Sequence, residues 1–365
     1  MLRAQDSTVA PGHLRISLVT CGTGDLIWQT FGHTALRVID SAKGTDMVFN
    51  YGTFSFGDDF ALQFMRGKLL YSLSFYPYDA FLEEYIEDKR SVEEQVLLMD
   101  EPTKERVYAL LKENALPENR DYKYDFFFDN CATRIRDIIP KAIGSDFAYG
   151  KTVADSSRLT FRNIINRYYH KDHWLRTGIN ILLGSRIDAV MDNKDIMFLP
   201  DYLRDGVAGA TINGKPFATP VELVLEGAPK QPAGVNWPLV VNLFVALITI
   251  LGLTLPGLKP LGQVMQFLLL LVTGLLGVLI LVMWFATDHQ GCQNNFNILW
   301  ALPTNVFIAF ARKRNKGKYA LAGIGLILLA LILHVLRVQE LPLMEISPLL
   351  LALLFVYGTI YRKDR

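Results

Sequence analysis

The 365-residue sequence carries almost no net charge, because 37 lysines and arginines balance 36 aspartates and glutamates and the formal charge is +1. This balance gives neither the basic field that nucleic acid attracts nor an acidic surface, so we expect no nucleic-acid partner. Cysteine is scarce as well. Cys21, Cys131 and Cys292 form no C-x-x-C pair and match no metal-ligand spacing. We therefore expect no bound metal and no cofactor.

An odd number of cysteines leaves at least one unpaired. A disulfide between Cys21 and Cys292 stays open if both lie outside the cytoplasm, but we favour Cys21 as a small core residue that closes a strand. The first residues, 1–6, contain no apolar stretch of the length that a secretory signal has. For an exported domain, we expect the natural product to be longer.

Long apolar runs fill the last third of the chain. The five segments with this composition are 237–258, 261–286, 298–311, 319–336 and 346–361. The first, second and fourth reach the roughly 18–20 residues that span hydrocarbon. The third and fifth are shorter and include a proline. We predict an all-α transmembrane bundle of about five helices.

Lysine and arginine are distributed unequally among the loops of this region. The loop 312–318 and the tail 362–365 are basic, whereas the loop 287–297 has no lysine or arginine and the loop 337–345 has only Arg337. Because short cytoplasmic loops are enriched in these residues, the two basic segments are predicted to be cytoplasmic. With five crossings and a cytoplasmic tail, the N-terminal part of the chain lies outside.

The first 235 residues have the mixed composition of a globular domain, and their patterning predicts an α+β fold. We expect strands at 14–20, 33–39, 47–54 and 92–99, helices at 77–89 and 103–115, and a hairpin at Asn213-Gly214. The strand 33–39 alternates, so His33 and Arg37 point the same way. The Pro/Gly-rich stretch 227–234 is typical of a linker into the membrane.

The most informative local feature runs from Phe126 to Pro140. Asp129 and Asn130 are good N-cap residues, and apolar residues then repeat at helical spacing until Pro140, where we expect the helix to end. Cys131 is thereby placed in the first turn of a helix. Free backbone N–H groups and the positive end of the helix dipole favour the thiolate there, and the thiolate is the nucleophilic form.

A nucleophilic cysteine needs a base within hydrogen-bond reach, and His33 is the best candidate. It opens a strand directly after Phe31-Gly32, where the glycine allows close approach. Judged by residue type alone, a buried thiol and a core histidine are the simpler interpretation of the two residues. Spacing does not overturn that interpretation.

Several stretches nevertheless resemble one family. They are residues 31–38, Asn50-Tyr51-Gly52, residues 129–134, Trp174 to Gly184 with Asp188, residues 197–200, residues 287–289 and residues 295–297. Together they are similar to the Lnb family of Bacteroidetes, membrane proteins with a periplasmic N-terminal domain that are described as lipoprotein N-acyltransferases. The order of His33 before Asn130-Cys131 also resembles the permuted papain-like fold of NlpC and lecithin:retinol acyltransferase relatives, whose activities differ.

The resemblance implies a permuted papain-like catalytic domain over 1–143, a membrane-proximal extension and linker over 144–235, and the transmembrane bundle over 236–365. It implies a bacterial inner-membrane protein with a periplasmic catalytic domain. Cys131 would accept an acyl chain from a membrane phospholipid as a thioester and pass it to the N-terminal amine of a diacylated lipoprotein, with His33 moving the protons.

Further site residues are expected around these two. Asn50 is our choice to orient His33, although one step in hairpin register would exchange its face with that of its neighbours. The residues that we expect to bind substrate are Arg37, Asn130, Arg134, Asp288, His289 and Asn295. For Arg37, a surface ion pair is an equally good interpretation. For Asp288, His289 and Asn295, ordinary polar residues of a loop are an equally good interpretation. Phe198-Leu199-Pro200 fits a core segment better than an acyl channel.

A second enzyme class uses the same cysteine and histidine. A membrane-tethered cysteine amidase or peptidase acting on cell-wall peptide would explain the first half of the chain, but one span would tether it. A non-catalytic envelope scaffold would explain the membrane spans, but it would give no reason for a cysteine, Cys131, directly after the N-cap Asn130.

Overall fold

The computed structural model describes residues 12–54, 60–68, 70–169, 172–229, 232–311 and 316–364. The basic loop 312–318, the tail 362–365, the linker 227–234 and the first residues 1–6 lie partly or wholly outside this part of the chain. Contacts divide the protein into a sheet unit, residues 1–64, 68–158 and 191–230, and a helical unit, residues 65–67, 159–190 and 231–365. The extension predicted over 144–235 is thus shared between the two units.

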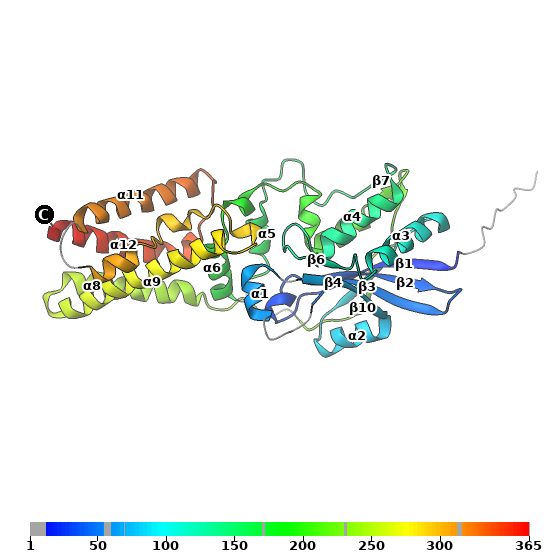
Figure 1. Ribbon diagram of the computed structural model, residues 1–365, viewed down its shortest axis with the longest axis horizontal. Coiled ribbons are helices and arrows are strands. Elements are labelled where there is room, and N and C mark those ends of the chain that lie inside the picture. The colour runs from blue at the N-terminus through cyan, green and yellow to red at the C-terminus, as the bar shows by residue number, and fades with distance from the viewer. Residues whose placement is uncertain are drawn as a thin grey trace, which may run out of the picture. The chain divides into compact units, whose positions relative to one another are not determined.

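The sheet unit is built on a seven-stranded antiparallel sheet with the order β10-β5-β1-β2-β3-β4-β6 (Figure 1). Its strands are β1 (Leu14–Cys21), β2 (His33–Asp40), β3 (Thr45–Thr53), β4 (Leu70–Pro77), β5 (Val92–Val96), β6 (Asp121–Lys123) and β10 (Glu222–Leu225). A three-stranded sheet follows, made of β7 (Phe147–Ala148), β8 (Thr211–Ile212) and β9 (Lys215–Pro216). Asn213 and Gly214, with φ of 50° and 75°, form the predicted hairpin between β8 and β9.

Helices cover both faces of the large sheet, which confirms the α+β prediction. They are α2 (Tyr78–Glu87), α3 (Glu101–Asn114), α4 (Cys131–Ile143) and α7 (Pro200–Ala208). In Figure 1, α2 lies below the sheet, and α3 and α4 lie above it. Val19, Ala35, Val48 and Phe81 are buried together on the α2 side. The segment Phe198-Leu199-Pro200 is fully buried, in agreement with its interpretation as core.

Helix α4 begins where the sequence predicts but continues past Pro140 to Ile143. The prediction that Pro140 ends the helix is therefore wrong. Proline has no N–H to donate to the carbonyl of the residue four positions earlier, which here is Arg136. The hydroxyl of Tyr149 donates to that carbonyl at 2.8 Å, so the freed acceptor keeps a partner and the helix continues.

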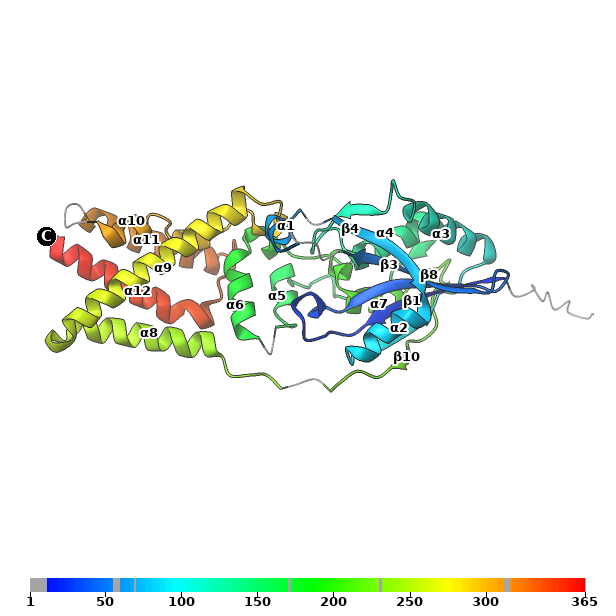
Figure 2. The ribbon, with the colours of Figure 1, turned by 60° about the horizontal axis from the view of Figure 1, so that its bottom comes forward.

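The helical unit contains the membrane-spanning part of the chain. Its helices are α5 (Phe161–Ile165), α6 (His173–Leu182), α8 (Trp237–Thr254), α9 (Lys259–Phe285), α10 (Asn305–Phe310), α11 (Lys316–Val335) and α12 (Leu343–Asp364). Among the described residues, four helical stretches are long and apolar enough to cross a membrane: Trp237–Thr254, Pro256–Phe285, Lys316–Val335 and Leu343–Asp364. Figure 2 shows α8, α9, α11 and α12 as the long helices of this unit.

The third predicted span, 298–311, is not a continuous helix, so the predicted bundle of about five segments consists of four long helices and one broken segment. It holds the end of a 3₁₀ turn, Phe296–Leu299, and the short α10, with Pro303 between them. Irregular backbone is tolerated at membrane depth where protein covers it. Trp300 and Ala301, at the break, are fully buried.

This broken segment runs along α9 in the opposite direction. A Cβ at Gly277 would overlap the carbonyl oxygen of Ala301, and one at Gly274 would lie 2.5 Å from the backbone nitrogen of Val306. Because later residues of the segment meet earlier residues of α9, the segment returns along the length of that helix. The two glycines permit this close approach.

Candidate functional site

His33 enters the site through a tight connection from β1. In the pairing of β1 with β2, Cys21 lies opposite His33. Gly32 has a φ of 75°, and a Cβ on it would lie 2.6 Å from the carbonyl oxygen of Cys21. Only glycine fits this position without strain, so the Phe31-Gly32-His33 sequence fixes where the imidazole starts. Cys21 is fully buried at the end of β1, as predicted, and all three cysteines are free.

Asn50 on β3 contacts the imidazole of His33. The distance from His33 Nε2 to Asn50 Oδ1 is 2.6 Å, and Asn50 Nδ2 donates to the hydroxyl of Tyr76 at 2.9 Å. Because an amide oxygen only accepts, Nε2 carries the hydrogen and the neutral ring keeps its lone pair on Nδ1. The strand register that the sequence left open thus places Asn50 where it orients the histidine and selects its tautomer.

Cys131 is the first residue of α4, and Asn130 is its N-cap. The backbone N–H groups of Thr34, Ala132 and Cys131 act on the Cys131 thiol and lower its pKa. A Cβ at Gly52 would lie 3.7 Å from His33 Cε1 and 3.9 Å from Cys131 Cβ. Cys131 and His33 therefore both border Gly52, although they come from two elements far apart in the sequence.

The thiol and the imidazole are both neutral at rest. Burial raises the pKa of the Cys131 thiol to about 11, although the three backbone N–H groups act in the opposite direction. Burial lowers the pKa of His33 from its ordinary value of 6.5 to about 4, and its hydrogen bond with Asn50 opposes this only in part. The prediction of a resting thiolate is therefore corrected, because the cost of burying a charge outweighs the helix start. A neutral imidazole can accept the thiol proton when a substrate arrives.

Tyr122 on β6 is a site residue that the sequence did not reveal. Its hydroxyl lies 3.9 Å from the position of a Cβ at Gly52, so Tyr122 borders the same glycine as Cys131 and His33. The hydroxyl is buried and has no hydrogen-bond partner among the described residues. Burial raises the pKa of Tyr122 well above its usual value, so the hydroxyl keeps its proton and can donate it. The guanidinium of Arg134 lies over the ring, 4.1 Å from its centroid.

The predicted substrate-binding residues of the sheet unit have partners within the protein. Asn130 is 3% exposed, accepts from the Thr133 N–H at 2.9 Å and donates to the carbonyl oxygens of Phe126 and Phe198. Arg134 binds both carboxylate oxygens of Asp129, with its Nε 2.5 Å and its Nη2 2.7 Å from them. These contacts position the helix start around Cys131.

Arg37 forms the ion pair that the sequence left open as the alternative. Its Nε donates to Asp46 Oδ1 at 2.8 Å, its Nη1 donates to Glu94 Oε2 at 2.9 Å, and the guanidinium lies 3.6 Å from the ring centroid of Tyr78. The charge of Arg37 is thus already balanced by two carboxylates.

Asp288, His289 and Asn295 belong to the helical unit. The Asp288 N–H donates to the carbonyl oxygen of Arg66 at 2.9 Å, and His289 packs against Gly67. Asn295 is fully buried: its Nδ2 donates to the carbonyl oxygens of Ile181 and Leu182, and its Oδ1 accepts from Asn297 and Gln339. Asn295 therefore holds the bundle together through all its polar atoms.

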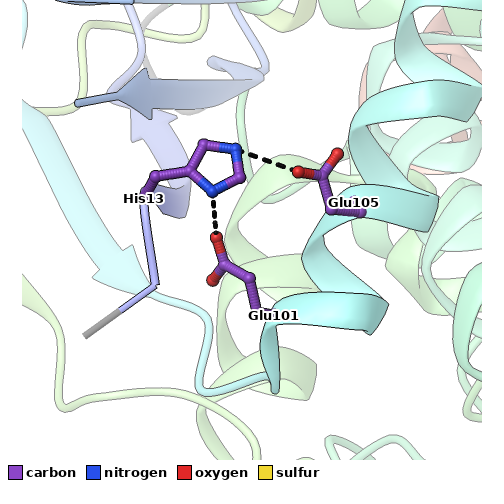
Figure 3. Close-up of side chains that lie close together, drawn as sticks. All are labelled: His13, Glu101 and Glu105. Carbon is purple, nitrogen blue, oxygen red and sulfur yellow. Dashed lines mark ion pairs between the residues drawn. The ribbon is translucent and has the colours of Figure 1, made fainter. Parts of the chain in front are cut away.

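One described group has side chains of the kind that bind metals: His13, Glu101 and Glu105 (Figure 3). His13 Nδ1 lies 2.9 Å from Glu101 Oε1, and His13 Nε2 lies 2.9 Å from Glu105 Oε1. The second oxygen of Glu101 accepts from Lys104 at 3.0 Å. Because each ring nitrogen already faces a carboxylate, we assign the group to holding the start of β1 against α3.

An α+β unit with a Cys–His–Asn cluster, on a chain that also carries membrane-spanning helices, defines a membrane protein with a candidate thiol site. A family model described as the Lnb N-terminal periplasmic domain matches residues 2–167, and one described as the Lnb transmembrane domain matches residues 230–364. The chain belongs to the Lnb family and is an inner-membrane protein with a periplasmic N-terminal domain. No curated protein and no solved structure matches the chain significantly.

Proposed function

We propose that this protein is a lipoprotein N-acyltransferase that moves an acyl chain from a membrane phospholipid, through a thioester on Cys131, to the N-terminal amine of a diacylated lipoprotein. The observation that carries the proposal is that Cys131 and His33 both border Gly52, with Asn50 in contact with the imidazole of His33. Membership of the Lnb family and the membrane-spanning helices support it, because donor and acceptor both reside in the bilayer.

In the first half-reaction, the Cys131 sulfur attacks the ester carbonyl carbon of the phospholipid while His33 Nδ1 takes the thiol proton. The carbonyl oxygen becomes an oxyanion, and the buried Tyr122 hydroxyl is the donor available to stabilise it. The C–O bond of the ester then breaks, and His33 returns the proton to the leaving oxygen. The products are an acyl-thioester and a lysophospholipid.

In the second half-reaction, the α-amine of the lipoprotein's N-terminal cysteine attacks the thioester carbonyl. His33 takes a proton from the attacking nitrogen, the C–S bond breaks, and Cys131 regains a proton through His33. Asn50 keeps the imidazole in the tautomer that both half-reactions need.

The test is mass spectrometry of lipoprotein N-termini in cells that carry the wild-type protein, Cys131→Ala or no copy of the gene. We expect triacylated N-termini only with the wild-type protein. Unchanged lipoproteins together with altered cell-wall fragments would instead favour an amidase or peptidase that uses the same two residues. No change in either would favour a non-catalytic protein.

A further inference from the structure

Three consecutive large apolar side chains are exposed on the connection between β1 and β2. Leu26, Ile27 and Trp28 are 46%, 48% and 50% exposed. Ile27 and Trp28 belong to the 3₁₀ turn η1 (Ile27–Gln29), Leu26 caps it, and the connection then leads directly to His33. Single exposed apolar residues are normal on a protein surface, but three consecutive ones shortly before His33 form an exposed apolar patch of the kind that marks an interaction surface.

The turn is held in place from its inner side. Gln29, which is 7% exposed, donates from Nε2 to Asp88 Oδ2 at 2.6 Å. The N–H groups of Gly24 and Gly32 both donate to the carbonyl oxygen of Gln29, at 3.0 Å and 3.1 Å. The polar residue of the turn thus faces inward and the apolar residues face outward. Their exposure is a consequence of these contacts.

We propose that Leu26–Trp28 is a membrane-inserting turn, which enters the boundary between the headgroups and acyl chains of the bilayer. The same chain carries helices that span this bilayer, so the protein is anchored at an apolar phase. Tryptophan favours the membrane interface, and leucine and isoleucine favour its hydrocarbon side. No residue of the turn is charged.

Insertion of the turn would have a direct consequence at the site. The ester groups of phospholipids lie at the depth that an interfacial tryptophan occupies, and the turn leads into the start of β2. The donor ester would therefore meet Cys131 and His33 while its acyl chains stay in the bilayer. This consequence rests on the proposed function. The insertion itself rests on the exposed side chains of Leu26–Trp28 and on the hydrogen bonds that hold the turn in place.

The insertion is tested in the full-length protein reconstituted in phosphatidylethanolamine–phosphatidylglycerol liposomes. A nitroxide is attached to Ile27→Cys in a Cys131→Ala background, in which the remaining Cys21 and Cys292 are buried. Collision rates with oxygen, which concentrates in hydrocarbon, and with a water-soluble nickel chelate are measured by electron paramagnetic resonance. The matched control is Leu116→Cys, because Leu116 is a 44% exposed apolar residue elsewhere on the sheet unit.

We expect the label at position 27 to collide mainly with oxygen and the label at position 116 mainly with the nickel chelate. Equal nickel accessibility at the two positions would overturn the proposal, because the turn would then lie in water. Protection of position 27 from both reagents would overturn it too, because a protein surface would then cover the turn.

A second measurement separates this inference from the proposed function. In active protein, Trp28→Ser should raise the KM for liposomal phospholipid about tenfold, whereas Leu98→Ser, at another exposed apolar position, should leave it unchanged. If the wild-type protein transfers no acyl chain but the label at 27 is lipid-exposed, the function fails and the insertion stands. If acyl transfer occurs and Trp28→Ser leaves KM unchanged with the label in water, only the insertion fails.

Discussion

Buried polar groups serve different purposes in the two units. In the helical unit, Arg162 is 1% exposed and binds both carboxylate oxygens of Asp188, the backbone and side chain of Asn180, and the carbonyl oxygens of Leu183 and Gly184. In the sheet unit, the buried Tyr122 hydroxyl beside Cys131 has no partner in the described part of the chain. A satisfied polar group fixes the backbone, whereas an unsatisfied one beside a thiol indicates where a reactant belongs.

The largest effect on activity should come from His33→Ala. The variant removes the group that accepts and returns the proton in both half-reactions, and a general base contributes about 10²–10⁴-fold. We expect a loss of that size in the rate of acyl transfer, with unchanged thermal unfolding. Near-normal transfer by the folded variant would show that another group acts as the base.

Tyr122→Phe should have the next largest effect. Removing one oxyanion donor costs about 10²–10³-fold in kcat. The phenylalanine ring keeps the packing against Arg134, so stability should stay the same or rise, because no buried hydroxyl is left unpaired. The matched control is Tyr51→Phe, since the Tyr51 hydroxyl already accepts from Asn114 Nδ2 at 2.8 Å. If both variants lose activity equally, the Tyr122 hydroxyl has no special role.

Arg162→Met should show the opposite behaviour, a loss of stability with no change in the rate per folded molecule. Breaking a buried ion pair costs about 3–5 kcal/mol because the other charge is left unpaired. Thermal unfolding in detergent measures the loss, and the double variant with Asp188→Leu should recover part of it. A large change in kcat of folded Arg162→Met would show that this buried group of the helical unit affects catalysis as well as stability.

The smallest effect is expected in the pH dependence of kcat/KM, on its acid side. His33 has a pKa near 4 in the folded protein, below its ordinary 6.5, so it is neutral above pH 4 and loses its basic lone pair below it. We expect kcat/KM to fall only as the pH approaches 4. Asn50→Ala should move this limb to lower pH, because the hydrogen bond with Asn50 raises the pKa of His33. A limb near pH 6.5 would show that the pKa of His33 is not lowered in the folded protein.

Local signals predicted the parts of the structure that depend on neighbouring residues. The N-cap Asn130 and the helical spacing after it placed Cys131 at a helix start, and the alternation after Gly32 placed His33 at a strand start. The pairing of Asn50 with His33 was not predictable, because a shift of one residue between strands exchanges the two faces. That register depends on contacts across the whole sheet.

Long-range effects account for the predictions that failed. The pKa of Cys131 depends on its burial, which no local pattern shows, and burial reversed the effect expected from the helix start. The third segment can be irregular around Pro303 because Trp300 and Ala301 are buried, which apolar composition alone does not reveal. Tyr122 reaches the site only because β6 pairs with β4, far from it in the sequence.

The most direct measurement is the mass of the peptide that contains Cys131 after incubation with phospholipid and no acceptor. If Cys131 carries the acyl group, this peptide gains one fatty acyl chain, and hydroxylamine removes it, because a thioester is labile to hydroxylamine and an amide is not. Addition of a diacylated lipoprotein peptide should discharge the adduct. An unmodified Cys131 peptide, in a preparation that transfers acyl chains once the acceptor is added, would contradict the covalent mechanism.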